Sequence, residues 1–396
     1  MDYERVIGLE VHCELKTNSK MFSASPVTFG EDPNTMINEV DMGMTGTLPC
    51  LNKRGVEFAI RVCHALHMEI DELLCFDRKN YYYSDLPKGF QITQDKRPIG
   101  RNGYLMIEVD GEEKRIDIER LHMEEDTAKQ LHLTDYSLID YNRAGIPLIE
   151  IVTKPCIRSG KEASAYLEAL RQVFLYTEVS DAKLEEGSMR CDVNVSIRPF
   201  GQEAFGTRTE IKNLNSISNV QKAIDYEAGR QQEVIESGGE VLQETRRYDE
   251  VEKVTTVMRS KGDAVDYKYY TEPNILPIRL DHAWVEQIKD ELPMMAGERE
   301  KHYEEEYGIP KVDAKILVST KSMSDYFNEV IKYTKNYKNA SNWLLGDVLA
   351  FLNKNNQSYD DIELNPEYLA KLINFIEDGT TVSYTHLRAH ETLANL

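Results

Sequence analysis

The chain lacks the features that mark secreted, membrane-spanning and DNA-coating proteins. No apolar run approaches the roughly 20 residues that a helix needs to cross a bilayer. The N-terminus has neither the basic flank nor the apolar stretch of a signal peptide. Basic residues are in the minority, with 47 Lys and Arg against 68 Asp and Glu and a formal net charge of −21. We therefore expect a cytoplasmic protein that binds neither a membrane nor DNA, although net charge does not exclude a local basic patch.

Cysteine pairs in Cys-x-x-Cys spacing are also absent. The six cysteines are Cys13, Cys50, Cys63, Cys75, Cys156 and Cys191. Scattered thiols in a chain of 396 residues are typical of reduced, cytosolic cysteines. With 41% hydrophobic and 29% charged residues, the chain can bury a core, which excludes wholesale disorder and a fibrous protein.

The period of the apolar residues changes along the chain. Helical spacing over 53–68, 159–179 and 216–237 alternates with segments of period two up to about residue 280. Helical stripes then dominate, over 281–292 and from Ser341 and Pro366 onward. This pattern predicts an α+β fold, with helices packed on one side of a largely antiparallel sheet, and a domain boundary near Pro293.

Three alternating runs have unusual polar faces. These faces comprise Glu10, His12 and Glu14; Arg190, Asp192, Asn194 and Ser196; and Arg208, Glu210 and Lys212. The simplest interpretation of the first run alone is a surface strand. An ordinary solvent face would however carry more Lys, Thr and Gln. Short acids, an imidazole, an amide and cations on one shared face favour a Mg²⁺ and phosphate site.

Two further segments offer acidic groups. Residues 122–126 (HMEED) form a dense acidic cluster, for which a solvated turn is an equally good interpretation. Glu150 lies within an apolar strand that follows Asn142 and Arg143 at a turn. An unpaired buried charge is costly, so Glu150 needs a partner or a metal ion.

An aromatic run, Tyr81 to Tyr83, lies between Lys79 and Lys88. Aromatic rings beside lysines can stack a base or sugar and hold phosphates. A strand followed by a turn explains the same residues equally well.

Several ordered segments together resemble one known family. They are GLEVH (8–12), YYYSDLPKGFQITQ (81–94), LHMEEDTAK (121–129), DYNRAGIPLIEIVTKP (140–155), GSMRCDVNVSIRP (187–199), TEIKNLNS (209–216), QETRRYDE (243–250) and MRSK…DYKYYTEPN (258–274). From residue 3 to about 380 the chain is similar to the B subunit of aspartyl/glutamyl-tRNA amidotransferases (GatB).

The resemblance implies a subunit that binds misacylated Glu-tRNA(Gln) or Asp-tRNA(Asn). It implies that ATP and Mg²⁺ are used to phosphorylate the side-chain carboxylate of the attached amino acid. A separate amidase, the A subunit, would hydrolyse glutamine and send ammonia through a tunnel, and a small C subunit would hold both in a heterotrimer. The implied fold is a cradle-like α+β domain, here 1–293, followed by a helical tail domain, here 294–380.

Residue roles follow from this resemblance together with polarity and position. The predicted metal ligands are Glu10, His12, Glu125 and Glu150, and the predicted catalytic residues are Glu10, His12, Glu125 and Asp192. The predicted ATP contacts are Lys79, Tyr81, Lys88, Asn142, Arg143, Arg190, Asn194, Glu210 and Lys212.

The chain departs from the family in two places. Many members have a zinc site of Cys-x-Cys followed by Cys-x-x-Cys, but here these positions are Ser23, Ser25, Asn38 and Asp41, so we expect no zinc. Residues 381–396 do not fit the family and are expected to be a non-native segment, which leaves the tail domain incomplete and loosely ordered from about Lys338.

Two alternatives to a catalytic ligase subunit remain. A non-catalytic tRNA-binding scaffold of the same complex would use the polar face only structurally. A free-standing ATP-dependent amide ligase with a small substrate is less favoured, because the sequence has no glutaminase motif.

Overall fold

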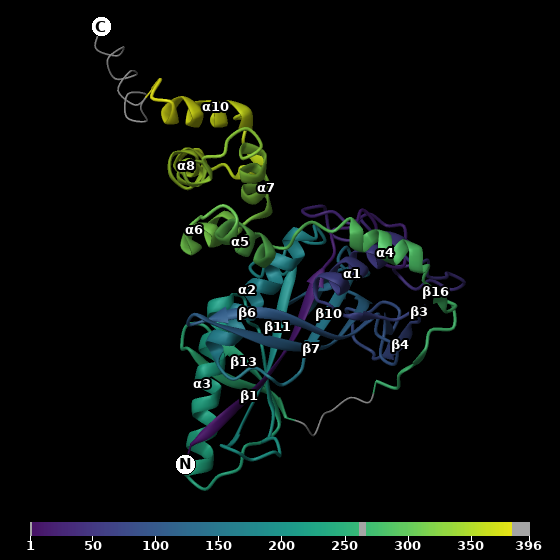
Figure 1. The fold of residues 1–396 in the computed structure, drawn as a ribbon. Helices are drawn as coiled ribbons and strands as arrows, with labels where there is room; N and C mark the ends of the chain where they lie inside the picture. Colours follow the sequence, from purple (N-terminus) through teal and green to yellow (C-terminus); the bar gives the residue numbers. More distant parts are fainter. Residues whose placement is uncertain (1, 261–266, 382–396) are drawn as a thin grey trace. The chain divides into compact units, whose positions relative to one another are not determined.

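The computed structural model describes residues 2–260 and 267–381, with the side chains of 259 and 260 excepted. The chain divides into two compact units, Met1–Leu292 and Pro293–Leu396 (Figure 1).

Unit 1 is built on a nine-stranded sheet with the order β14-β13-β12-β11-β1-β10-β7-β6-β2. The strands are β1 (Tyr3–Glu14), β2 (Glu69–Ile70), β6 (Gly100–Val109), β7 (Glu112–Glu125), β10 (Pro147–Thr153), β11 (Met189–Pro199), β12 (Thr209–Lys212), β13 (Glu244–Asp249) and β14 (Val254–Ser260). Every neighbouring pair is antiparallel except β12 and β13. The predicted α+β class with a mostly antiparallel sheet is therefore confirmed.

The pairing register gathers the polar side chains on one face of this sheet. Glu10 lies opposite Asp192 on β11, and His12 lies opposite Glu150 on β10. Glu150 in turn lies opposite His122 on β7. Directly paired residues project to the same face of an antiparallel sheet, so side chains far apart in sequence converge there.

The other face of the sheet is apolar and forms the core with three helices. Ile7, Leu9 and Val11 of β1 are fully buried. The helices are α1 (Lys53–Ala65), α2 (Gly160–Tyr176) and α3 (Ile217–Glu236), as the helical spacing predicted apart from their ends. Asn52, Ser159 and Ser216 cap them by accepting backbone N–H groups, as short polar side chains do before a first turn.

Three small sheets complete unit 1. They are β15 (Tyr270–Thr271) with β4 (Asp77–Asn80) and β5 (Phe90–Thr93), β16 (Ile278–Arg279) with β3 (Leu73–Leu74), and the hairpin of β8 (Lys129–His132) and β9 (Ser137–Asp140). The segment 267–292 thus returns along this part of the unit and ends in α4 (His282–Asp290), which packs on α1 (Figure 1). An ion pair between Arg78 Nε and Glu272 Oε2, 2.5 Å apart, joins β4 to this returning segment.

Unit 2 is helical as predicted. Its elements are α5 (Ala296–Glu305), α6 (Lys311–Leu317), α7 (Lys321–Val330), α8 (Tyr337–Trp343), a π-helical turn (Leu344–Val348), α9 (Leu349–Lys354), a short 3₁₀ turn (Tyr359–Asp361) and α10 (Pro366–Glu377). The helices beyond Lys338 bury more side chains than expected, since Leu344, Leu352 and Ile373 are at most 2% exposed, whereas the loose order of this segment stays a prediction. The expected non-native segment 381–396 lies, except for residue 381, outside the described residues.

None of the described helices is both long enough and apolar enough to cross a bilayer.

Candidate functional site

The polar face of the nine-stranded sheet forms the floor of a cleft of about 300 Å³. Strands β1, β7, β10, β11 and β12 supply the floor, and the β15-β4-β5 sheet with its neighbouring segment supplies a wall. The lining residues are Glu10, His12, Lys79, Thr93, Gln94, Asp95, Arg120, His122, Glu124, Glu150, Asp192, Glu210, Lys212, Tyr267 and Tyr269.

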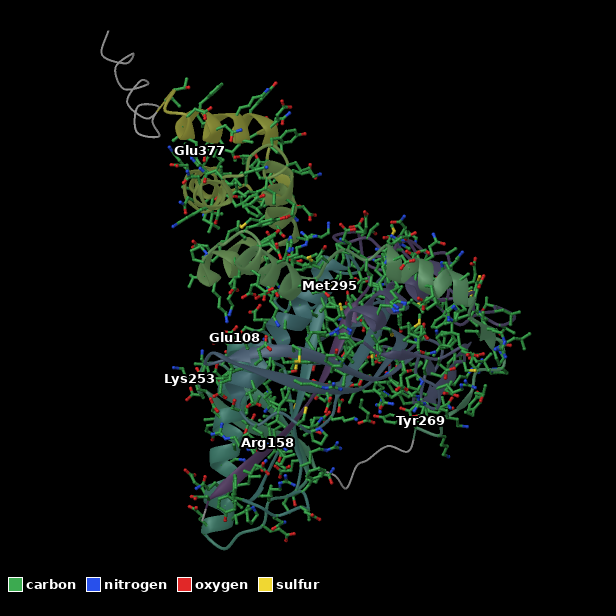
Figure 2. All side chains as sticks on the ribbon, viewed as in Figure 1. Glu108, Arg158, Lys253, Tyr269, Met295 and Glu377 are labelled. Carbon is green, nitrogen blue, oxygen red and sulfur yellow. The ribbon has the colours of Figure 1, made fainter. Side chains whose placement is uncertain are left out.

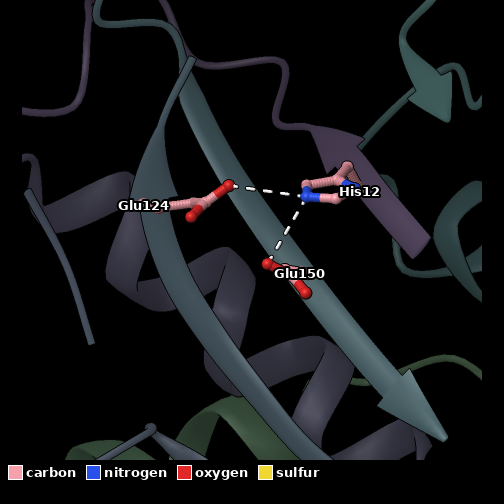
Figure 3. Close-up of side chains that lie close together, drawn as sticks. All are labelled: His12, Glu124 and Glu150. Atoms are coloured by element: carbon pink, nitrogen blue, oxygen red, sulfur yellow. Dashed lines mark ion pairs between the residues drawn. The ribbon is translucent and has the colours of Figure 1, made fainter. Parts of the chain in front are cut away.

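A first cluster of possible metal ligands consists of His12, Glu124 and Glu150 (Figure 3). The Nε2 atom of His12 lies 3.4 Å from Glu150 Oε2 and 3.7 Å from Glu124 Oε1. A second imidazole, that of His122, approaches the same two carboxylates, with its Nε2 atom 3.1 Å from Glu150 Oε2 and 3.6 Å from Glu124 Oε2. Two carboxylates on neighbouring strands are therefore flanked by two histidines.

A second cluster consists of Glu10, Asp192 and Glu210, on β1, β11 and β12. One donor atom from each residue lies within 4.8 Å of the others. Asn194 Nδ2 donates to Glu10 Oε1 at 2.8 Å, and Lys212 Nζ lies 2.5 Å from Asp192 Oδ2 and 3.1 Å from Glu210 Oε1. The second cluster thus offers only oxygen ligands, with one lysine already in place.

Burial and nearby negative charge act together on Glu10 of the second cluster. Burial raises the pKa of Glu10, and Glu150, Asp192 and Glu210 raise it further against the opposing hydrogen bond from Asn194. The charge of Glu150 in the first cluster raises the pKa of Glu10 in the second, so the two clusters interact electrostatically. A bound cation would relieve this repulsion.

The two histidines partly neutralise the first cluster. Burial by itself lowers the pKa of His122, but Glu150 and Glu124 outweigh it and raise the pKa to about 9. His12 behaves alike, since Glu150 and Glu124 raise its pKa against the effect of burial. In return the two imidazoles hold the pKa of Glu150 well below its ordinary value, although burial opposes them.

The donor sets fit divalent cations. Mg²⁺ prefers carboxylate oxygens and waters, and an imidazole nitrogen is also acceptable to Mn²⁺ and related ions. Both clusters supply carboxylates from separate rigid strands, so no loop has to rearrange to bring the ligands together.

Glu125, predicted as a metal ligand, is not brought into either cluster. Its carboxylate is held by Lys88 Nζ and accepts the backbone N–H of Ile92 at 3.0 Å. Its neighbour Glu124 faces the cleft instead, because successive side chains of a strand point to opposite faces. The sequence contained the signal: His122 and Glu124 are two apart in a segment that alternates.

Three predicted ATP contacts have partners outside the cleft. Asn142 holds a loop, accepting the N–H of Met36 at 2.8 Å and donating to the carbonyl of Asp32 at 2.8 Å. Arg143 donates to the carbonyls of Thr127 and Ala128. Neither side chain lines the cleft, and Lys88 does not line it either.

Arg190 lies on the polar face but is committed to another carboxylate. Its Nη2 atom is 2.5 Å from Asp126 Oδ2 and 3.9 Å from Glu14 Oε1. Burial raises the pKa of Glu14, and Asp126 raises it further, to about 8. Arg190 is therefore occupied by these two acids and does not line the cleft.

The wall of the cleft is aromatic and carries one lysine. Lys79 Nζ lies 4.8 Å from the ring centre of Tyr267. Tyr81 does not itself line the cleft but packs edge-on against the same ring at 5.7 Å. Tyr269, labelled in Figure 2, continues this row at 6.2 Å from Tyr267. Of these residues the sequence indicated Lys79 and Tyr81, whereas Tyr267 and Tyr269 come from a segment far along the chain.

The positions expected to lack zinc form a buried network of hydrogen bonds and one ion pair. Asp41 accepts hydrogen bonds from Ser23 Oγ at 2.6 Å, from Ser25 Oγ at 2.5 Å and from the N–H of Asn38 at 3.0 Å. The fully buried Lys20 completes it, with its Nζ atom 3.4 Å from Asp41 Oδ2. These residues satisfy one another as they stand.

Comparison with known proteins places the chain in a family. Residues 5–286 match the family described as "GatB/GatE catalytic domain", and residues 325–388 match the one described as "GatB domain". The chain therefore belongs to the GatB family, whose members are subunits of tRNA-dependent amidotransferases.

Individual relatives are similar over nearly the whole chain. A protein of Staphylococcus aureus (strain MRSA252) is 54% identical over 383 residues, which are 97% of this chain and 81% of the relative. One of Mesoplasma florum is 52% identical over 387 residues, which are 98% of this chain and 81% of the relative. Both are named as the B subunit of an aspartyl/glutamyl-tRNA(Asn/Gln) amidotransferase.

Proposed function

We propose that this chain activates the side-chain carboxylate of glutamate or aspartate on misacylated tRNA by phosphorylation with ATP, and that the activated group is then converted to an amide. The observation that carries this proposal is the pair of carboxylate clusters on the floor of one cleft, with cations beside them. Membership of the GatB family indicates a role in a tRNA-dependent amidotransferase reaction. The site suggests that this chain carries out the activation of the carboxylate.

The reaction has two steps. A carboxylate oxygen of the substrate attacks the γ-phosphorus of ATP, the bond to the β,γ-bridging oxygen breaks, and ADP leaves. Ammonia then attacks the carbonyl carbon of the acyl phosphate, inorganic phosphate leaves, and one proton passes from nitrogen to solvent or to a base. The amide of Gln-tRNA or Asn-tRNA results.

The first step brings two anions together, which sets the demands on the site. Positive charge must screen the phosphates and the attacking carboxylate, as in other phosphoryl transfers. Glu10, Asp192 and Glu210 form the candidate all-oxygen Mg²⁺ site, and His12, Glu124 and Glu150 form a second cation site. A bound Mg²⁺ ion would neutralise part of the negative charge of the phosphates.

The chain's own residues contribute orientation and charge. Lys212 is held between Asp192 and Glu210, where it can meet phosphate oxygens, and Asn194 fixes the orientation of the Glu10 carboxylate. Lys79 and the tyrosines beside it form a wall suited to a ribose or base and its phosphate. An acyl phosphate hydrolyses readily, so the bound substrates would have to keep water away from the reacting group.

Ammonia and assembly would come from partners. The names of the relatives describe a B subunit, and thus complexes with further members. We propose an amidase, the A subunit, as the source of ammonia, and a small C subunit as the third member of a heterotrimer.

A non-catalytic tRNA-binding scaffold is the alternative. A scaffold has no need of six metal-ligating groups that converge in two clusters, which favours the catalytic role. A free-standing ligase is disfavoured because the relatives are named as subunits.

The deciding experiment measures ATP hydrolysis that depends on misacylated tRNA, with the chain assembled into the heterotrimer with its amidase and its small partner. We expect Glu150→Gln to abolish it and Glu233→Gln, an exposed change on α3, to leave it intact. Retained hydrolysis in Glu150→Gln would leave the scaffold as the better interpretation.

A further inference from the structure

The β7 end of the cleft carries a cation that neither carboxylate cluster uses. Arg120 lies on β7 two residues before His122 and is paired in register with Val152 on β10. It therefore faces the cleft, which it lines. Its one ion pair among the described residues is with its sequence neighbour Glu119 at 3.5 Å, and the two side chains are 39% and 53% exposed. An exposed pair of this kind holds a guanidinium only weakly.

An acid lines the same end of the cleft. Asp95 follows β5, and its backbone N–H donates to Asp77 Oδ2 at 3.0 Å. The next carbonyl, that of Lys96, accepts from Arg101 Nη2 at 2.6 Å, and Arg101 is paired in register with Arg120. The backbone around Asp95 is thus fixed to both neighbouring strands. Its carboxylate has no hydrogen bond or ion pair to another residue within 2–260 and 267–381.

The opposite end of the cleft is different. There the cation, Lys212, is already bound between Asp192 and Glu210. The β7 end therefore offers one positive and one negative group without strong protein partners among the described residues, whereas the β12 end offers groups that are occupied by one another.

A misacylated tRNA has the complementary pattern of charge. Its aminoacyl group bears an α-ammonium and, two or three carbon atoms further on, the side-chain carboxylate that reacts. We propose that Arg120 binds this carboxylate and Asp95 binds the α-ammonium. This aminoacyl subsite rests on the proposed function. It places the amino acid at the β7 end, next to His122 and Glu124, and leaves the β12 end for the phosphates.

The subsite would also bind the substrate more tightly than the product. Arginine binds a carboxylate through two parallel, charge-assisted hydrogen bonds. Amidation turns that carboxylate into a neutral amide, so the product loses its strongest contact while the α-ammonium contact stays. Arg120 therefore favours Glu-tRNA over Gln-tRNA, and Asp95 does not distinguish them.

The first test compares the affinities of Glu-tRNA(Gln) and Gln-tRNA(Gln) for the assembled complex at one salt concentration, because phosphate contacts make tRNA binding salt-dependent. We expect the wild type to prefer Glu-tRNA by about tenfold, the scale of a charge-assisted hydrogen bond. Arg120→Gln should bring this ratio close to one. Arg115→Gln on the same strand, where the arginine pairs with Asp117, is the matched control and should keep the ratio. An unchanged ratio in Arg120→Gln, or none in the wild type, overturns the assignment of Arg120.

The second test removes the other charge from the ligand. N-acetylation of Glu-tRNA abolishes the α-ammonium, and binding at pH 6.5 keeps the free amino group protonated, below its ordinary pKa of about 8. We expect acetylation to weaken binding several-fold in the wild type and in the control Asp135→Asn, an exposed acid in the β8–β9 turn. Acetylation should have no effect in Asp95→Asn. An equal acetylation effect in all three proteins overturns the assignment of Asp95.

These binding ratios separate the two proposals. Absence of tRNA-dependent ATP hydrolysis in the wild type would overturn the proposed function, whereas normal hydrolysis with unchanged ratios would overturn only the subsite. A loss of fold would weaken the binding of both ligands equally and leave each ratio as it was.

Discussion

His122 provides the sharpest physical prediction, because its charge depends on the carboxylates around it. Its pKa of about 9 lies well above the ordinary histidine value near 6.5. A group whose pKa is raised by folding stabilises the native state fully below its unfolded pKa and loses that contribution as the pH rises through the folded pKa. We therefore expect the metal-free protein to lose stability between about pH 6.5 and pH 9.

The size of this loss follows from the shift. A difference of roughly two to three pKa units corresponds to a free energy of unfolding on the order of 3 kcal/mol. His122→Asn should remove this part of the pH dependence. Chemical denaturation in the presence of a chelator, at pH 6 and pH 9.5, measures the difference between the variant and the wild type. His132→Asn, a change of an exposed histidine, is the control and should retain the wild-type slope.

A direct titration checks the same reasoning. The NMR signal of His122, assigned through the variant, should titrate near pH 9 without divalent cations and at a lower pH with them, because a cation at Glu124 and Glu150 competes with the imidazolium. A His122 that titrates at or below pH 6.5, or a pH dependence that His122→Asn leaves unchanged, would refute the argument.

Three further outcomes are expected. In the assembled complex, Glu10→Gln and His12→Ala should each abolish tRNA-dependent ATP hydrolysis, while glutamine hydrolysis by the amidase survives. Wild-type rates of ATP hydrolysis in both variants would contradict the assignment of these residues as metal ligands. The purified protein should contain no stoichiometric zinc, and one zinc per chain by elemental analysis after dialysis against a mild chelator would contradict this. Asp41→Asn should lower the free energy of unfolding by about 3–5 kcal/mol, because Lys20 is left buried without its carboxylate; a loss no larger than that of the exposed control Asp135→Asn would show that the pair is dispensable.

The sequence revealed the parts of the site that obey a local period. Alternation in β1, β11 and β12 placed Glu10, Asp192 and Glu210 on polar faces, and the structure brings these three together. The same rule, applied to residues 122–126, would have selected Glu124 instead of Glu125, since a shift of one residue moves a side chain to the other face.

The long-range arrangement of the strands could not be predicted from local patterns in the sequence. No period in the sequence states that β1 lies between β10 and β11, or that Tyr267 returns to the wall beside Lys79. Arg120 was missed for the same reason, since it becomes a cleft residue only through pairing with β10 and the approach of β5. The packing of the helices after Lys338 was also misjudged, because the buried partners of Leu344 and Ile373 cannot be counted from single amphipathic stripes.

The position of β1 in the sheet has a consequence for folding during synthesis of the protein. Strand β1 lies in the middle of the sheet, and the two strands that flank it, residues 147–153 and 189–199, are synthesised after it. At about 5–20 residues per second, completing both edges takes on the order of ten to forty seconds of translation. During that interval β1 has an apolar face and two unpaired edges, which are the features that recruit other strands. The strand that carries Glu10 and His12 is thus synthesised well before its neighbours, and it lacks the second of them until residue 199 has emerged.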